Sequence, residues 1–189
     1  MSRIVLINES SVDQEVDAIV NAANKYLLAG HGVCGAIFKK AGYEELTAAC
    51  NQVNLPLKDG EAAITPAFNI ENAQYIIHAV GPNFAFTPEA FQELFNAYYN
   101  SLNILRDNNL HSISFPLISS GIFGGNLPNP VGESTKQCLR AYSSFVKENP
   151  DYEILVKLCA FTEKEMKLAE EVFNSYNQTN EAEPKLLKR

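Results

Sequence analysis

Two asparagines followed by a glycine-rich loop are the most chemically informative part of this chain. Asn21 and Asn24 come directly after an apolar stretch. Three glycines then open a helical pattern, at Gly30, Gly32 and Gly35. Glycine lets the backbone approach a ligand closely, and the first N–H groups of a helix are unpaired and attract phosphate. The Asn24 amide offers both a donor and an acceptor to sugar hydroxyls. An amide for a sugar next to a loop for a phosphate predicts a nucleotide-derived ligand.

A second glycine-rich loop follows another strand-like stretch. It reads Ser-Ser-Gly-Ile-Phe-Gly from Ser119, directly after the apolar run at residues 113–117. In an open α/β sheet, loops at the carboxyl ends of neighbouring parallel strands face one crevice, where ligands bind. Each loop would then hold one phosphate of a pyrophosphate, and Phe123 would offer its ring to a sugar or base. The alternative is a pair of tight turns without a ligand.

The first loop also matches the dinucleotide-binding pattern Gly-x-Gly-x-x-Gly. That pattern requires glycines immediately after the first strand and an acidic residue about 20 positions later, at the end of a second strand. Here the Asn pair separates the strand from Gly30, and the corresponding downstream region is Leu55-Pro56, inside a loop. The spacing therefore argues against a nicotinamide-dinucleotide fold.

The apolar pattern predicts strands that alternate with helices. Several strand-like runs are apolar almost throughout, as at residues 75–80, which is typical of strands covered on both faces. The predicted strands are residues 4–7, 18–20, 62–66, 75–80, 112–116 and 154–160, and the predicted helices are residues 35–49, 88–107, 133–147 and 163–176. This alternation predicts an α/β fold around a largely parallel sheet.

Composition limits the classes of protein that remain. The 189 residues are 46% hydrophobic, which suffices for one core. The four cysteines are scattered and form no metal-ligand spacing with the three histidines, so neither a metal, a cofactor nor a disulfide framework is expected. A formal net charge of −7 argues against binding of duplex nucleic acid.

No apolar run approaches the ~18 residues that span a bilayer, so no membrane association is expected. A monomer in the cytoplasm is the default expectation, with export by a route without a signal peptide as the alternative. Residues 1–176 are predicted to form one domain. Residues 177–189 are polar and are predicted to be a frayed C-terminal tail, or alternatively a docking peptide.

Four motifs in this chain resemble, in order, the successive signatures of the macro domain family. They read Asn-Ala-Ala-Asn from Asn21, Gly-His-Gly-Val from Gly30, His-Ala-Val-Gly-Pro from His78 and Ser-Ser-Gly-Ile-Phe-Gly from Ser119. The resemblance covers roughly residues 3–175. It implies a three-layer α/β/α sandwich with a central mixed, largely parallel sheet and a crevice for ADP-ribose.

The resemblance also implies a function. The protein would bind ADP-ribose and hydrolyse mono-ADP-ribose from acidic side chains of modified proteins. The alternatives are a reader that binds ADP-ribose or ADP-ribosylated partners without turnover, and a deacetylase of O-acetyl-ADP-ribose. Substrate-assisted hydrolysis, in which a water held near the pyrophosphate attacks and the phosphate accepts its proton, needs no strong protein base.

The same resemblance assigns the site residues. Asn24 would hydrogen-bond the distal ribose, which makes it the main catalytic candidate, with Gly32 and Cys34 beside it. Phe123 would lie against the distal ribose. The implied ligand-binding set is Ser10, Ser11, Ala22, Asn24, Gly32, Val33, Cys34, Ser119, Ser120, Gly121, Ile122, Phe123 and Gly124.

Two positions depart from the family pattern. Ser10 occupies the place where relatives commonly have an aspartate for the adenine amino group, and losing that charge-assisted bond costs on the order of 1 kcal/mol. Glu9 or Asp13 could compensate. Cys34 stands where one hydrolase branch has an aspartate, although certain viral macro domains share the Gly-Val-Cys sequence.

A thiol with a pKa of about 8.5 is a poor substitute for a carboxylate in activating water. Cys34 is therefore expected to be a small residue that fits beside the ribose. A helix N-terminus could lower its pKa and make it reactive, which is the alternative.

Overall fold

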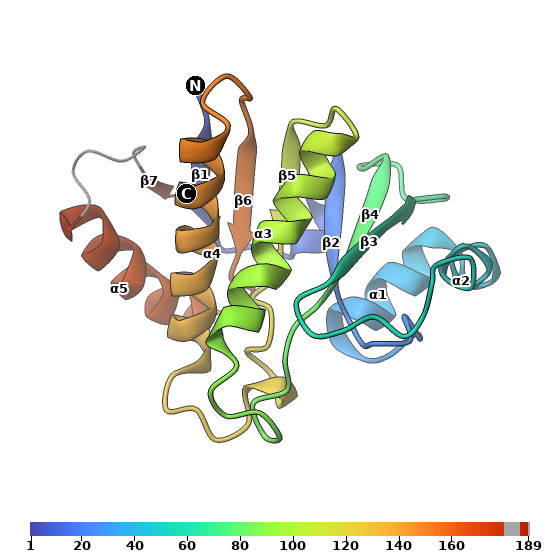
Figure 1. Cartoon of the computed structure of the whole chain (residues 1–189), viewed down its shortest axis with the longest axis horizontal. Helices are drawn as coiled ribbons and strands as arrows, with labels where there is room; N and C mark the ends of the chain where they lie inside the picture. The colour runs from blue at the N-terminus through green and yellow to red at the C-terminus, as the bar shows by residue number, and fades with distance from the viewer. Residues whose placement is uncertain (180–185, 189) are drawn as a thin grey trace.

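The computed structural model describes residues 1–179 and 186–188, which form a sheet between two groups of helices (Figure 1). The sheet order is β3-β4-β2-β5-β6-β1-β7, and every neighbouring pair is parallel except β3 and β4. The strands are β1 (Arg3–Ile7), β2 (Ala18–Ala23), β3 (Ala62–Pro66), β4 (Tyr75–Val80), β5 (Ser112–Phe115), β6 (Leu155–Cys159) and β7 (Leu186–Lys188). The predicted mixed, largely parallel sheet is confirmed.

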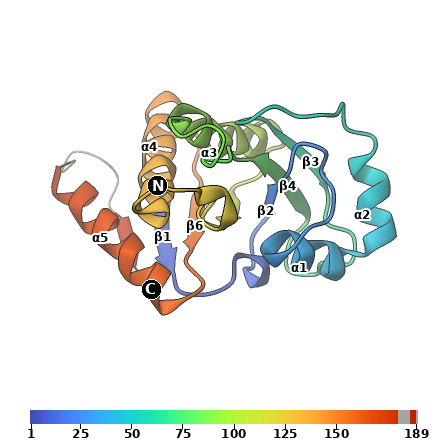
Figure 2. The ribbon, with the colours of Figure 1, turned by 90° about the horizontal axis from the view of Figure 1, so that it is seen from below.

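Helices cover both faces of the sheet (Figures 1 and 2), so the three-layer sandwich is confirmed as well. The helices α3, α4 and α5 pack on one face, and α1 and α2 pack on the other. Their bounds are α1 (Gly32–Ala41), α2 (Tyr43–Cys50), α3 (Phe91–Asp107), α4 (Pro130–Glu148) and α5 (Glu163–Thr179), with short 3-10 turns η1 (Ser11–Asp13) and η2 (Ile122–Gly124). None of these helices is long and apolar enough to cross a membrane.

Strand β2 shows how the sequence builds the two cores. Successive side chains of a strand point to opposite faces. Val20 therefore joins the apolar cluster under α3 and α4, whereas Ile19 joins the cluster under α1 and α2. Asn21 shares the face of Ile19, so a polar amide is placed beneath α1 inside a mostly apolar layer.

Two helix predictions differ from the structure. The helix predicted at 35–49 is broken at Gly42, whose φ of +109° lies outside the helical region, so α1 and α2 are separate. The helix predicted at 88–107 begins only at Phe91. Just before the predicted start, the N–H and Oγ1 of Thr87 both donate to the carbonyl of Asn83, at 3.0 Å each, and hold a turn.

The C-terminal region also differs from the predicted polar tail at 177–189. Helix α5 continues to Thr179, and Leu186–Lys188 pair in parallel with β1 at the edge of the sheet. Residues 180–185 and 189 lie outside the described residues. A backbone pairing of this kind depends on the free edge of β1, which no local pattern reveals.

Candidate functional site

The sheet topology brings three loops to one edge. β2 pairs in parallel with both β4 and β5. The loops that follow these strands, at residues 24–31, 81–90 and 116–125, therefore leave the sheet at the same edge, the lower one in Figure 1. This confirms that the two glycine-rich loops lie at the carboxyl ends of neighbouring parallel strands, where ligands bind in open α/β sheets.

Asn24 holds the first loop in shape through its own side chain. Its Oδ1 accepts hydrogen bonds from the backbone N–H groups of Tyr26 (3.2 Å) and Leu28 (3.0 Å), and its Nδ2 donates to the Leu28 carbonyl (2.8 Å). Both lone pairs of the amide oxygen are thus occupied, and one Nδ2 hydrogen remains. Asn24 can therefore donate a hydrogen bond to a sugar hydroxyl but cannot accept one, whereas the sequence predicted both.

The start of α1 has the features of an anion site. Gly32, its first residue, is exposed with a φ of +61°, and Val33 is half-buried. His31 makes no side-chain capping bond, and the first turn contains no acidic residue. The N–H groups of this turn therefore face no competing carboxylate and match the chemistry of a phosphate.

Gly35 fixes how closely the loop packs on α1. A Cβ at this position would lie 2.6 Å from the carbonyl oxygen of Gly30, so the backbone of the loop could not come as near to the helix. Gly35 is therefore needed for the close packing of the loop on α1, in addition to any role in ligand binding.

Cys34 lies under the loop and is 7% exposed. Its Sγ lies 3.5 Å from the carbonyl oxygen of Leu28. Burial raises the pKa of the thiol, and the smaller opposing effects come from the backbone of Gly30 and the amide of Asn21. A raised pKa favours the prediction of a small, unreactive residue beside the ribose over the alternative of an activated thiol.

A buried polar row runs behind Cys34. The Nδ2 of Asn21 donates to Nδ1 of His78 (3.1 Å), so Nε2–H of His78 donates to Oγ1 of Thr65 (2.9 Å). Burial lowers the pKa of His78 to about 4, so the ring is neutral at physiological pH. His78 is fully buried within β4, so its ring supports the core.

The second loop is held by its serines. Ser119 has a φ of +58°, and its Oγ donates to the carbonyl of Pro82 (2.7 Å). Ser120 Oγ donates to the carbonyl of Leu117 (2.7 Å). Gly81 makes this contact possible, because a Cβ there would lie 2.3 Å from Ser119 Oγ.

The tip of this loop presents both backbone and apolar surface. Gly121 is exposed, and a Cβ there would meet nothing within 4 Å, whereas Gly124 is buried. Ile122 is 90% exposed and Phe123 is 37% exposed. The Phe123 carbonyl accepts from the N–H of Phe84 (2.8 Å), which joins this loop to the one after β4.

Ser10 and Ser11 lie at the short turn η1 before β2. Ser10 Oγ accepts from the N–H of Val12 (3.3 Å) and caps the turn. The Ser11 carbonyl accepts from Oγ of Ser114 in β5 (2.8 Å), while Ser11 Oγ is buried with no hydrogen-bond partner among the described residues. Ala22 is half-buried at the end of β2.

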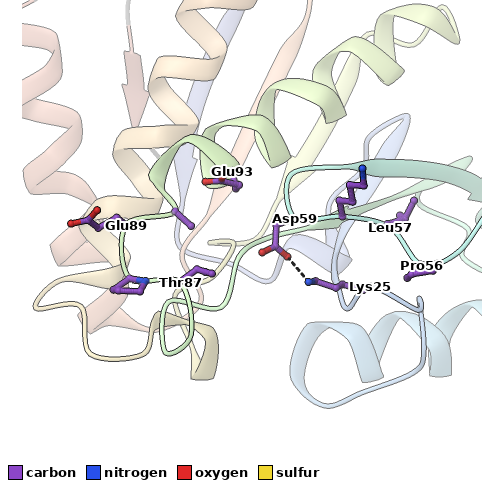
Figure 3. Close-up of a pocket in the computed structure, with 10 residues that line it drawn as sticks. Lys25, Pro56, Leu57, Asp59, Thr87, Glu89 and Glu93 are labelled. Atoms are coloured by element: carbon purple, nitrogen blue, oxygen red, sulfur yellow. Dashed lines mark ion pairs between the residues drawn. The ribbon is translucent and has the colours of Figure 1, made fainter.

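A cavity of about 900 Å³ opens beside the first loop (Figure 3). It is lined by Lys25, residues 56–59, residues 87–90 and Glu93, and by none of the predicted ligand-binding residues. The sequence did not predict this cavity, because three segments that are far apart along the chain form its walls. The only sequence signal for it is that Lys25 directly follows Asn24. Across residues 1–179 and 186–188, no group of side chains could hold a metal ion.

Comparison with known proteins defines the family. Residues 20–129 match the macro domain family. The ADP-ribose glycohydrolase MACROD1 of Mus musculus is 39% identical over 153 residues, which are 80% of this chain and 45% of that protein. This chain therefore spans less than half of that relative's length. The chain belongs to the macro domain family.

Solved structures agree with this assignment. The Oceanobacillus iheyensis macrodomain with ADP matches with a TM-score of 0.81 and 35% identity, covering 92% of each chain. The Trypanosoma brucei macrodomain in complex with ADP-ribose matches with a TM-score of 0.77 and 32% identity, covering 89% of this chain and 68% of that one.

Proposed function

We propose that this protein binds ADP-ribose and hydrolyses mono-ADP-ribose from acidic side chains of modified proteins. The observation that carries the proposal is the arrangement of two glycine-rich loops at the ends of adjacent parallel strands, with a side-chain donor of Asn24 beside them. Relatives named as ADP-ribose glycohydrolases and macrodomains crystallised with ADP or ADP-ribose support the choice of ligand.

The two loops would divide the ligand between them. The N–H groups of Gly32 and Val33 would hold one phosphate and residues 119–124 the other, so the diphosphate is neutralised by backbone dipoles and no cation is needed. The remaining Nδ2 hydrogen of Asn24 would orient the distal ribose, with Phe123 against its other side. Ser10 and Ser11 would lie toward the adenine, and Ala22 along the wall.

Hydrolysis would follow from this placement. A water beside the pyrophosphate attacks one of two carbons. Attack on the anomeric carbon breaks its bond to the ester oxygen, and the side-chain carboxylate leaves. Attack on the ester carbonyl carbon breaks the bond from that carbon to the ribose oxygen, so the ribose hydroxyl leaves and the water oxygen becomes part of the carboxylate. The phosphate accepts the proton of the water, because the buried Cys34 thiol stays protonated and cannot act as a base. Cys34 therefore contributes shape to the site.

A second candidate function is a reader that binds ADP-ribosylated partners without turnover. The protonated Cys34 favours it, since this residue supplies no base where one hydrolase branch has an aspartate. Deacetylation of O-acetyl-ADP-ribose would use the same loops. A monomer in the cytoplasm remains the expectation for either activity.

The decisive experiment uses a protein mono-ADP-ribosylated on a glutamate. Release of ADP-ribose is followed over time, and free ADP-ribose is titrated calorimetrically in parallel. Turnover with binding is the expected result. Binding without turnover would identify a reader, and the absence of both would overturn the proposal.

A further inference from the structure

The cavity beside the first loop, here called the side groove, is a direct continuation of the proposed ADP-ribose site. On one wall, Lys25 follows Asn24, and its carbonyl accepts from the N–H of Leu57 (2.8 Å). Its Nζ lies 3.6 Å from Oδ1 of Asp59, the ion pair drawn in Figure 3. The strand-β2 loop and the segment at 56–59 therefore form one surface.

The opposite wall continues from the second loop. Phe123 is joined by its carbonyl to Phe84, and the chain then turns over Asn83 to reach Thr87, which lines the side groove. In Figure 3, Thr87 and Glu93 lie across from Lys25 and Asp59, and Glu89 lies beyond Thr87 at the outer end of the groove. The first loop thus continues into one wall of the side groove, and the second loop is connected to the other wall.

The segment at 56–59, which lines one side of the side groove, is anchored by the residue that follows it. Gly60 packs on α3, where a Cβ would lie 2.9 Å from Cβ of Asn96. The carbonyl of Gly60 also accepts from Nδ2 of Asn100 (2.8 Å), which ties the segment at 56–60 to the helix. A groove fixed in this way loses little conformational entropy when it is occupied.

Charge in the side groove is uneven. Lys25 and Asp59 neutralise each other, but Glu89 and Glu93 make no ion pair within the described part of the chain. Only Lys58 opposes these two carboxylates within the lining. The wall next to α3 is therefore acidic and suits a cationic group.

Two exposed aromatic side chains flank the side groove. Tyr26, next to Lys25, is 57% exposed, and Phe86, next to Thr87, is 83% exposed. Aromatic residues are enriched where polypeptides dock, so these two rings offer contact surface beside the side groove.

We propose that the side groove binds the polypeptide next to the modified residue of the substrate, and that Glu89 and Glu93 select Lys or Arg there. This inference rests on the proposed function: with the distal ribose at Asn24, the bond to the target protein leaves at that end, where the groove begins. Tyr26 and Phe86 contact the polypeptide on either side.

The main comparison uses two peptides mono-ADP-ribosylated on a single glutamate, one flanked by lysines and one by alanines. A third peptide, flanked by aspartates, serves to test charge reversal. The native protein is expected to prefer the lysine-flanked peptide by about fivefold in kcat/KM, in the range of two partly exposed charge contacts. The double variant Glu89→Gln, Glu93→Gln is expected to lose this preference, and Glu89→Lys with Glu93→Lys to reverse it toward an aspartate-flanked peptide.

The matched control changes the same charge elsewhere. Glu163→Gln with Glu171→Gln, both exposed on α5, should keep the fivefold preference, which separates a local contact from the net charge of the protein. Equal rates for both peptides in the native protein, or a preference that survives in Glu89→Gln, Glu93→Gln, would overturn the inference while leaving the proposed function intact.

If ADP-ribose binds without turnover, the same ratios are read from peptide dissociation constants. If free ADP-ribose does not bind at all, the proposed function fails and the inference falls with it.

Discussion

Asn24 and Cys34 donate to the same backbone carbonyl. The Nδ2 of Asn24 lies 2.8 Å and the Sγ of Cys34 lies 3.5 Å from the oxygen of Leu28. The amide proposed for catalysis and the thiol of Cys34 are therefore linked through the backbone of one loop. Their substitutions should nevertheless differ, because only Asn24 has a hydrogen left to give to a ligand.

Replacing Asn24 with alanine should lower turnover by about 100-fold, the usual cost of one positioned donor. The variant also loses the three hydrogen bonds that shape the loop, so the calorimetric affinity for ADP-ribose should weaken as well. The protein should still fold, since Asn24 is half-buried in a loop. Full turnover with normal ADP-ribose binding would show that Asn24 does not orient the ribose.

Replacing Cys34 with alanine or serine should change turnover by no more than about threefold. Burial raises the pKa of this thiol, so its protonated form predominates at neutral pH in the native protein, and no base is removed. The measurement is a profile of kcat between about pH 6 and 9. A rising alkaline limb in the native protein that disappears in Cys34→Ala would show that the thiolate takes part.

Local patterns predicted most of the fold and the placement of the two glycine-rich loops at one edge of the sheet. The apolar run of β4 and the glycines after β2 and β5 are properties of neighbouring residues, and the resemblance supplied the ligand. The occupied lone pairs of Asn24 and the raised pKa of Cys34 were not predictable, because both depend on how residues 24–34 fold onto the sheet.

The side groove was hidden for a similar reason. Lys25, Asp59 and Glu93 are far apart in sequence and carry ordinary surface charges, which a sequence shows only as solvated residues. Their relation appears once Gly60 is seen to pack on α3. The helix break at Gly42 follows from the backbone angle of that residue, and the pairing of β7 follows from the open edge of β1. Neither can be inferred from the local sequence.

Introducing Asp in place of Ser10 should strengthen ADP-ribose binding by about fivefold, corresponding to on the order of 1 kcal/mol for a charge-assisted bond to the adenine amino group. An aspartate can also keep the capping bond that Ser10 makes to the N–H of Val12. Calorimetry with ADP-ribose and with its inosine analogue measures the change. An equal gain for both ligands would place the new carboxylate away from the adenine.

Gly81→Ala should destabilise the protein by about 2 kcal/mol and weaken ADP-ribose binding. The new Cβ would lie 2.3 Å from Oγ of Ser119 and 2.4 Å from Cγ2 of Ile118, so the second loop must move. Gly121→Ala is the control for stability, because its Cβ meets nothing within 4 Å, and its unfolding free energy should change by less than about 0.5 kcal/mol. Urea denaturation compares the two, and equal stabilities would contradict the packing argument.

Acidification should weaken the fold through His78. Burial lowers its pKa from 6.5 to about 4, so between these values the unfolded chain binds a proton that the folded protein does not. The stabilisation is complete above about pH 6.5 and is lost as the pH falls to about 4, amounting to about 3 kcal/mol. Urea denaturation across this range should show a smaller fall in His78→Gln, while His31→Gln, an exposed position, should follow the native protein. Parallel curves for the native protein and His78→Gln would mean that other groups cause the loss.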